Sequence, residues 1–189
     1  SKLIKDIYLA TDNKKSKKIG LNANIKVPFL RPKYLSDNFI DIKSILTFFL
    51  DRLEKKKTID IVVVATENFP LRNYNIFDKM INKLIKNNLD TVIACKEEKG
   101  SIFIKKENKL NKINDGEVPF NLRSQDAFTS RIGIAYVARA SSLRKEGNLF
   151  SSRLGYHYID NALEMTEINS ENLSKNIKEV IKISYTNNK

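Results

Sequence analysis

Polar residues that could bind an anionic ligand follow the most apolar run of the sequence. Residues 59–65 (Ile-Asp-Ile-Val-Val-Val-Ala) are nearly continuous in apolar character, as a buried central strand requires. Thr66, Glu67 and Asn68 come directly after this run, and Arg72 lies near the end of the same loop. Ligands of open α/β sheets bind at the carboxyl ends of the strands, so this loop lies where a substrate is expected.

The elements that must position this loop can be predicted from apolar periodicity. Runs rich in β-branched residues predict strands at residues 6–10, 59–65 and 91–95. A helix is expected between the last two strands, because apolar residues recur there at spacings of three and four and form one buried stripe. The residues of this stripe are Ile76, Phe77, Met80, Ile81, Leu84 and Ile85. A second helix is expected over residues 41–53.

The second half of the chain contains shorter apolar segments. They predict strands at residues 102–104, 134–137, 156–159 and 163–168, in a mixed or antiparallel arrangement. A last helix is expected from Ser170, a good N-cap residue. Its inward residues are expected to be Leu173, Ile177, Val180 and Ile181. The pattern as a whole predicts one α/β domain over residues 1–189, with three αβα layers around a mainly parallel, Rossmann-like sheet and a mixed carboxy-terminal part.

The net charge of +12 raises nucleic acid as a partner. However, lysine runs such as residues 14–15, 17–18 and 55–57 are scattered, and they are not interleaved with the aromatic residues on which single-stranded nucleic acid stacks. A solvated surface is the better interpretation, so no nucleic-acid partner is predicted. The charge favours small anionic ligands instead.

A single cysteine, Cys95, cannot form an intramolecular disulfide, and its apolar neighbours predict a buried structural thiol. A reducing, cytoplasmic environment is therefore expected. No apolar run reaches the roughly 18 to 20 residues that a membrane span needs, so no membrane association is predicted.

Five segments, in the correct order along the chain, resemble the acylneuraminate cytidylyltransferases, which activate sialic acids. They are residues 7–12 (Ile-Tyr-Leu-Ala-Thr-Asp), 27–37 (Val-Pro-Phe-Leu-Arg-Pro, then Leu-Ser-Asp), 64–72 (ending in Pro-Leu-Arg), 121–137 (Asn-Leu-Arg-Ser-Gln-Asp, then Arg-Ile-Gly-Ile-Ala-Tyr-Val) and 167–169 (Glu-Ile-Asn). The resemblance implies a cytidylyltransferase-like domain that uses CTP and an acidic sugar and forms a homodimer.

In nucleotide binding, the resemblance assigns roles to Arg31, Asp41, Thr66, Glu67 and Asn68. Arg31 is also the expected catalytic residue, because a permanently charged guanidinium can hold a triphosphate while charge builds on the departing pyrophosphate. The alternative is that Arg31 caps a carbonyl or pairs with Asp37. The carboxylate of Glu67 could repel phosphate or help to hold a metal. For Arg72, ligand contact and a structural cap or pair are equally open.

For the sugar, the resemblance implies a second group of residues around residues 121–137. They are Arg123, Gln125, Arg131, Gly133 and Tyr136. Arg123 could bind the sugar carboxylate through a forked pair of hydrogen bonds, or it could lie in a surface loop. Gly133 is expected to let the backbone approach the sugar.

Family members bind magnesium through two aspartates spaced by one residue, and the matching residues here are Glu167 and Asn169. On a strand this spacing puts both side chains on one face, so both oxygens could reach one Mg²⁺ ion. The alternative is that Asn169 and Ser170 begin the last helix.

The implied reaction is transfer of CMP from CTP to a sialic acid or related nonulosonic acid, as in lipopolysaccharide or capsule biosynthesis. A further strand and helix are expected before residue 6, because a central parallel strand needs neighbours on both sides. The glycine-rich phosphate loop that the family carries there is not among residues 1–189. A catalytically degenerate or truncated homologue, acting as a binding or assembly domain, is therefore the alternative.

Overall fold

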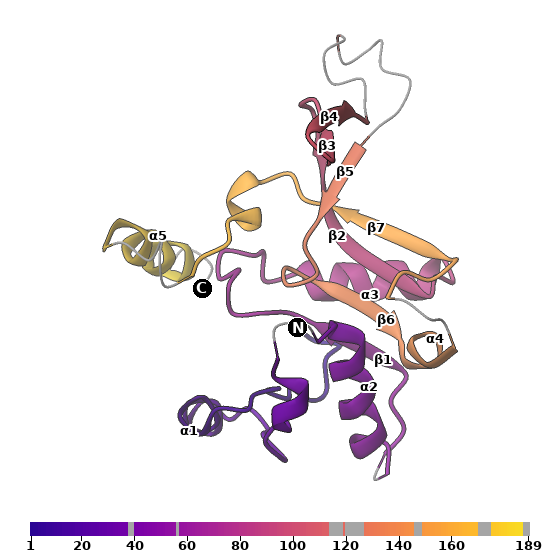
Figure 1. Ribbon diagram of the computed structural model, residues 1–189. Coiled ribbons are helices and arrows are strands. Elements are labelled where there is room, and N and C mark those ends of the chain that lie inside the picture. Colours follow the sequence, from indigo (N-terminus) through magenta and orange to yellow (C-terminus); the bar gives the residue numbers. More distant parts are fainter. Residues whose placement is uncertain are drawn as a thin grey trace.

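The computed structural model describes residues 1–37, 40–55, 57–113, 119, 127–145, 149–169 and 175–186. Figure 1 shows a mixed α/β arrangement with helices on either side of a twisted sheet and other helices set apart from it. The helices are α1 (Lys14–Asn22), α2 (Ile42–Leu53), α3 (Ile76–Lys86), α4 (Ala140–Lys145) and α5 (Lys175–Thr186), with short 3₁₀ turns η1 (Lys33–Leu35) and η3 (Ala162–Met165). The strands are β1 (Ile61–Val64), β2 (Thr91–Glu98), β3 (Phe103–Lys106), β4 (Lys109–Lys112), β5 (Ala127–Ser130), β6 (Tyr136–Arg139) and β7 (Leu154–Tyr158).

The larger sheet is organised around β2. The first half of β2 pairs with β6 and with β7, its second half pairs with β5, and β6 in turn pairs with β1. Among the four strand pairings of this sheet in the described residues, only β2–β7 is parallel, and the other three are antiparallel. The predicted mainly parallel sheet is therefore wrong. Although β1, β2 and β7 share one direction, β6 runs against them between β1 and β2, and a single strand's direction cannot be predicted from apolar periodicity.

Strands β5 and β6 together form one interrupted strand along β2. Ser130, the last residue of β5, pairs with Cys95, and Tyr136, the first residue of β6, pairs with Ile93. Residues 131–135 therefore stand opposite the single residue Ala94, whose N–H donates to the carbonyl of Ala135 (3.2 Å). We call this segment the 131–135 bulge. Such insertions bend a strand away from its ladder and re-aim its side chains.

The two faces of the sheet are covered by different helices. Alternate residues of the strands, such as Val92 and Val137, pack under Ile76, Met80 and Leu84 of α3. The intervening residues, such as Tyr136 and Ala138, pack under α2 and α4. This alternation follows from the two-residue period of a strand and gives helices on both faces, as the sequence predicts.

Most predicted elements are present, with three differences. Residues 6–10 do not form a buried strand: Tyr8 makes only an isolated bridge to Lys26, and Ile7 is 61% exposed. Residues 163–168 form the turn η3 and an extended segment instead of a strand. Helix α5 is described over Lys175–Thr186, and its Val180 is 40% exposed instead of packing inward. The predicted start at Ser170, and Leu173, lie outside the described residues.

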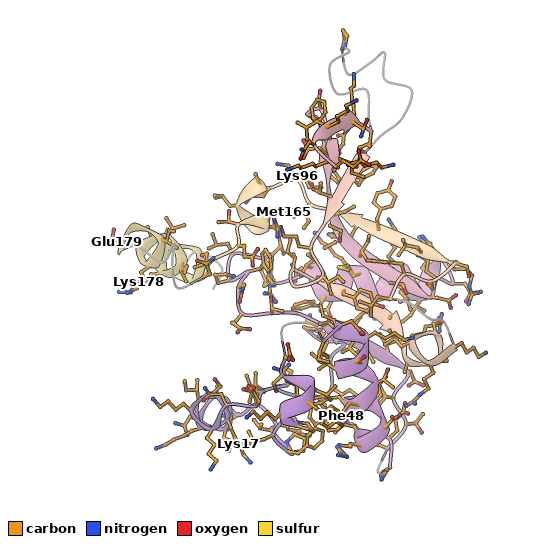
Figure 2. All side chains as sticks on the ribbon, viewed as in Figure 1. Lys17, Phe48, Lys96, Met165, Lys178 and Glu179 are labelled. Atoms are coloured by element: carbon orange, nitrogen blue, oxygen red, sulfur yellow. The ribbon has the colours of Figure 1, made fainter. Side chains whose placement is uncertain are left out.

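The charged side chains are dispersed over the molecule. Figure 2 shows the labelled Lys17 on α1, Lys96 on β2 and Lys178 on α5 in three separate places. Cys95 on β2 is buried, and burial raises the pKa of its thiol. Among the described residues, no helix combines the length and the apolar character that a membrane span needs.

The stripe of α3 provides a test of the core. Leu84 is completely buried, whereas the adjacent Ile85, which periodicity also predicts to be buried, is 55% exposed. We expect Leu84→Ala to lower the free energy of unfolding by about 2–5 kcal/mol, because it removes buried methyl groups and leaves a cavity. Ile85→Ala should cost less than about 1 kcal/mol. Urea denaturation of both variants measures the difference; equal losses would contradict the placement of this helix.

Candidate functional site

The candidate site lies where the chain leaves the carboxyl end of β1 and meets the 131–135 bulge. The backbone N–H of Thr66 donates to the carbonyl of Gly133 (2.8 Å), and the Thr66 hydroxyl lies 3.4 Å from the same oxygen. The loop after β1 is thus joined to the bulge by residues 67 positions apart in the sequence. The sequence predicts both segments to be near a ligand, and the structure brings them together.

Gly133 is required by the contacts of the chain itself. A Cβ atom at this position would collide with the hydroxyl of Thr66 and would lie 2.8 Å from a ring carbon of Phe69, which is buried. The sequence analysis assigns this glycine to close approach of a sugar. The structure instead fills the space beside its Cα with Thr66 and Phe69, so its small size serves the joint between loop and bulge.

A small polar network continues the site. The carboxylate of Glu167 accepts from the side-chain amide of Asn68 (3.3 Å) and from the guanidinium of Arg131 (3.0 Å). The backbone N–H of Ile168 donates to the carbonyl of Asn68 (2.7 Å). Three segments with predicted nucleotide, sugar and metal roles therefore meet at Glu167. The Arg131–Glu167 pair is substantially exposed, so it contributes little to stability and its charges are accessible to solvent.

The residues predicted to hold magnesium do not assemble a suitable set of ligands. Glu167 already bonds to the guanidinium of Arg131, and Asn169 would add a neutral carbonyl where magnesium favours anionic oxygen. Both residues lie on an extended segment instead of the predicted strand. Within the described part of the chain, no group of three or more His, Cys, Asp or Glu side chains could hold a metal ion.

Arg72 shapes the loop after β1 from within. Its Nε donates to the carbonyl of Phe69 (2.8 Å), and a terminal nitrogen donates to the carbonyl of Thr66. These bonds close the turn over residues 66–72, which favours the structural alternative for this arginine. Glu67 in the same loop is exposed, so its carboxylate faces solvent.

Arg31 lies in the amino-terminal region, apart from the group around Thr66, Arg131 and Glu167. Its Nε donates to the Ser36 hydroxyl (3.3 Å), and a terminal nitrogen lies 4.0 Å from a carboxylate oxygen of Asp12. The backbone N–H of Arg31 donates to the carbonyl of Thr11 (2.8 Å), which joins two of the matching segments. A hydrogen bond from Ser36 is the main cause that lowers the pKa of Asp12, and the charge of Arg31 acts in the same direction. Among the described residues, no polar contact joins Arg31 to the loop at Thr66.

The remaining predicted residues are placed as follows. Asp41 is the N-cap of α2: its carboxylate accepts from the backbone N–H of Ser44 (2.7 Å), and this bond is the main cause of its lowered pKa. Tyr136 is completely buried, and its hydroxyl donates to the carbonyl of Leu149 (2.6 Å), so it is a core residue instead of a surface for a sugar. Arg123 and Gln125 lie outside the described residues.

Two features of the site differ in how far the sequence predicts them. The pairing of Arg131 with Glu167 is not predicted, and the closure of the loop by Arg72 is one of two alternatives that the sequence leaves open. The first joins residues 36 positions apart, and nothing in the local pattern around either residue indicates its partner. The second is a local contact. The sequence Pro-Leu-Arg is compatible both with ligand contact by Arg72 and with a structural role for it.

Comparisons with known proteins find a similar fold without sequence similarity. No family model matches the chain, and no curated protein sequence matches it. The structure is similar to that of a CMP:2-keto-3-deoxy-manno-octonic acid synthetase solved in complex with CTP, with a TM-score of 0.61 and 10% sequence identity. The similarity covers 97% of this chain and 82% of the synthetase chain. At this identity the comparison establishes the fold alone: a mixed α/β arrangement similar to that of the synthetase.

The joint at Gly133 makes a specific prediction. We expect Gly133→Ala to lower the free energy of unfolding by about 1–3 kcal/mol, because the added methyl group overpacks the contact with Thr66 and Phe69. Gly100→Ala is the control, since a Cβ there would meet only the flexible carboxylate of Glu98, at 3.2 Å. Thermal or urea denaturation compares the two variants. A Gly133→Ala protein as stable as the wild type would contradict the described joint.

Tyr136 provides a second test, because its burial assigns it to the core. Tyr136→Phe leaves the carbonyl of Leu149 without this donor, so we expect a loss of about 1–2 kcal/mol in stability. Tyr156→Phe, at a half-exposed position, should change stability by less than about 0.5 kcal/mol. Denaturation curves of the two variants measure the effect, and equal curves would rule out the buried hydrogen bond.

Proposed function

We propose that this protein is a cytidylyltransferase that transfers CMP from CTP to an acidic sugar, a sialic acid or a related nonulosonic acid. The observation that carries the proposal is the convergence of the Thr66–Asn68 loop, the 131–135 bulge and Glu167 at the carboxyl end of β1. This is the end of an α/β sheet at which ligands bind. The likeness of the fold to a CTP-bound sugar-acid synthetase supports the choice of substrates.

In the proposed reaction, the anomeric hydroxyl oxygen of the sugar forms a bond to the α-phosphorus of CTP. The bond between that phosphorus and the bridging oxygen breaks, and pyrophosphate leaves with the electron pair. The hydroxyl proton passes to solvent. Both substrates are anions, so the protein's task is to position them and to offset their charge. The net charge of +12 attracts such substrates.

The proposed roles combine what the family resemblance implies with the surroundings of each residue. Arg31, held by Ser36 and Thr11, presents a guanidinium that would bind the triphosphate and stabilise charge on pyrophosphate. Thr66 and Asn68, in the loop after β1, would contact the nucleotide. Arg131 is more than half exposed, and its pairing with Glu167 leaves it accessible to the sugar carboxylate.

A second candidate function is supported by one feature of the site. The polar groups of Asn68, Arg131 and Glu167 already satisfy one another, and Gly133 is packed against Thr66 and Phe69. A site that is filled by its own side chains suits a catalytically degenerate homologue that acts as a binding or assembly domain. In that case the chain forms a homodimer and does not turn over CTP.

CTP binding and turnover separate the two candidates. Isothermal titration of the full chain with CTP measures affinity, and pyrophosphate release in the presence of an acidic sugar measures the reaction. We expect Arg31→Gln to weaken CTP binding by about tenfold or more, since it removes a charge-assisted hydrogen bond to phosphate. Ser36→Ala is the matched control, because it removes the partner of Arg31 and leaves its charge in place.

Each result favours one candidate. Saturable CTP binding that is weakened in Arg31→Gln and largely kept in Ser36→Ala supports the transferase. A wild-type chain that binds no CTP, measured with and without magnesium ions, would falsify it and would leave the binding or assembly domain. Sedimentation of the same sample then shows whether the chain is a dimer.

A further inference from the structure

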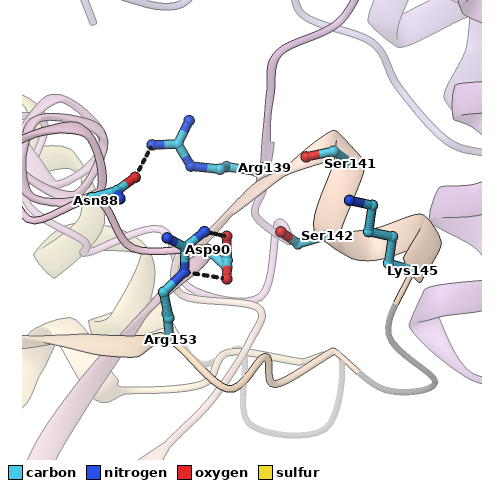
Figure 3. Close-up of a pocket in the computed structure, with 7 residues that line it drawn as sticks. All are labelled: Asn88, Asp90, Arg139, Ser141, Ser142, Lys145 and Arg153. Atoms are coloured by element: carbon cyan, nitrogen blue, oxygen red, sulfur yellow. Dashed lines mark hydrogen bonds and ion pairs between the residues drawn. The ribbon is translucent and has the colours of Figure 1, made fainter.

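A polar pocket lies at the opposite end of the sheet from the candidate site. Its volume is about 300 Å³, and it is formed where β2 and β7 begin and where the antiparallel strand β6 ends. Figure 3 shows its lining side chains converging from the end of α3, from β6 and α4, and from the segment before β7. They are Asn88, Asp90, Arg139, Ser141, Ser142, Lys145 and Arg153. Every one of these side chains is polar or charged.

The single carboxylate of the pocket is already neutralised. Asp90 is buried, and both of its oxygens accept from Arg153, at 2.8 and 2.6 Å. These bonds are the main cause that lowers the pKa of Asp90, and a hydrogen bond from Ser142 and the charge of Arg139 act in the same direction. Asp90 therefore stays ionised at neutral pH and fixes Arg153 in the wall. The pair contributes no net charge to the pocket.

Two further cations remain in the lining. Arg139 is held by neutral acceptors: its Nε donates to the carbonyl of Leu89 (2.9 Å), and a terminal nitrogen donates to the side-chain oxygen of Asn88 (3.5 Å). Lys145 is exposed at the end of α4. Within the described part of the chain, neither Arg139 nor Lys145 forms an ion pair. The pocket is therefore electropositive, with a guanidinium held in a fixed orientation.

We propose that this pocket binds a phosphate group, either as inorganic phosphate or as the phosphate of a small metabolite. A phosphate group has several terminal oxygens, which can accept together from a guanidinium, an ammonium and hydroxyl groups. Arg139, Lys145 and the hydroxyl of Ser141 supply these donors around one space, while the Ser142 hydroxyl donates to Asp90. A cation is excluded by the positive lining. The volume lies at the low end of the range for ligand pockets, which suits a compact anion.

The proposal is independent of the function assigned to the other end of the sheet. The pocket shares no residue with the group around Thr66, Arg131 and Glu167. Either inference can therefore fail without the other.

Phosphate-dependent stability of the full chain tests the proposal. At constant ionic strength, inorganic phosphate should raise the thermal unfolding temperature in a saturable manner, because it binds only the folded state. Lys145→Gln should weaken this apparent affinity by about tenfold, as expected for loss of one charge-assisted hydrogen bond. Lys17→Gln makes the same change of charge on α1, far from the pocket, and should leave the affinity unchanged. Arg139→Lys keeps the charge, loses the planar fork and should also weaken binding.

A comparison of two phosphate ligands identifies the source of the phosphate. Tighter binding of sn-glycerol 3-phosphate than of inorganic phosphate supports a phosphorylated metabolite, and the reverse order supports free phosphate. Weak metabolite sites have a Kd of roughly 1 mM. If the unfolding temperature shows no saturable rise at phosphate concentrations up to about 100-fold above this Kd, the proposal is overturned. The proposal is also overturned if Lys17→Gln lowers the apparent affinity for phosphate as much as Lys145→Gln does. Tighter binding of malonate than of inorganic phosphate and of sn-glycerol 3-phosphate overturns it as well.

Discussion

Five residues of one strand stand opposite a single residue of its neighbour, and the geometry of the candidate site depends on this mismatch. Because the pairing of Ser130 with Cys95 and of Tyr136 with Ile93 is fixed on both sides, residues 131–135 must leave the ladder. They carry Gly133 onto Thr66 and present Arg131 to Glu167. The buried Ile134 and Ala135 hold the bulge to the core, so the polar groups rest on a fixed support.

The same strand connects two ends of different chemical character. At its beginning, β6 follows a bulge in which Arg131 is balanced by Glu167. At its end lies Arg139, whose side chain donates hydrogen bonds to a backbone carbonyl and an amide oxygen, both neutral. Strand β6 is short and completely buried at Tyr136, Val137 and Ala138, so it separates the two ends without offering a ligand any access between them. The antiparallel direction of this strand therefore decides which arginine is placed at which end.

Much of the fold could be predicted from the sequence, because the buried stripe of α3 and the apolar runs of β1 and β2 repeat with the periods of their elements. The position of the loop after β1 followed from the same reasoning. The direction of β6 could not be predicted, since its residues are apolar in either orientation. Residues 6–10 have the composition of a strand, but strand formation needs a neighbour, and Tyr8 pairs only with Lys26. The sequence indicated that Gly133 allows a close approach, but it did not indicate which group approaches. The close neighbour is Phe69, which no local pattern predicts.

The burial of Cys95 in the longest strand has a practical consequence. Only a thiolate reacts readily with alkylating reagents, and a thiol that is enclosed and has a raised pKa stays protonated and out of reach. Because this is the single cysteine of the chain, the native protein is expected to react little with thiol-directed reagents. Two cysteines introduced at exposed positions, one at each end of the sheet, would therefore be the groups that receive fluorophores or spin labels. The distance between these two labels could then be followed in solution without altering the core.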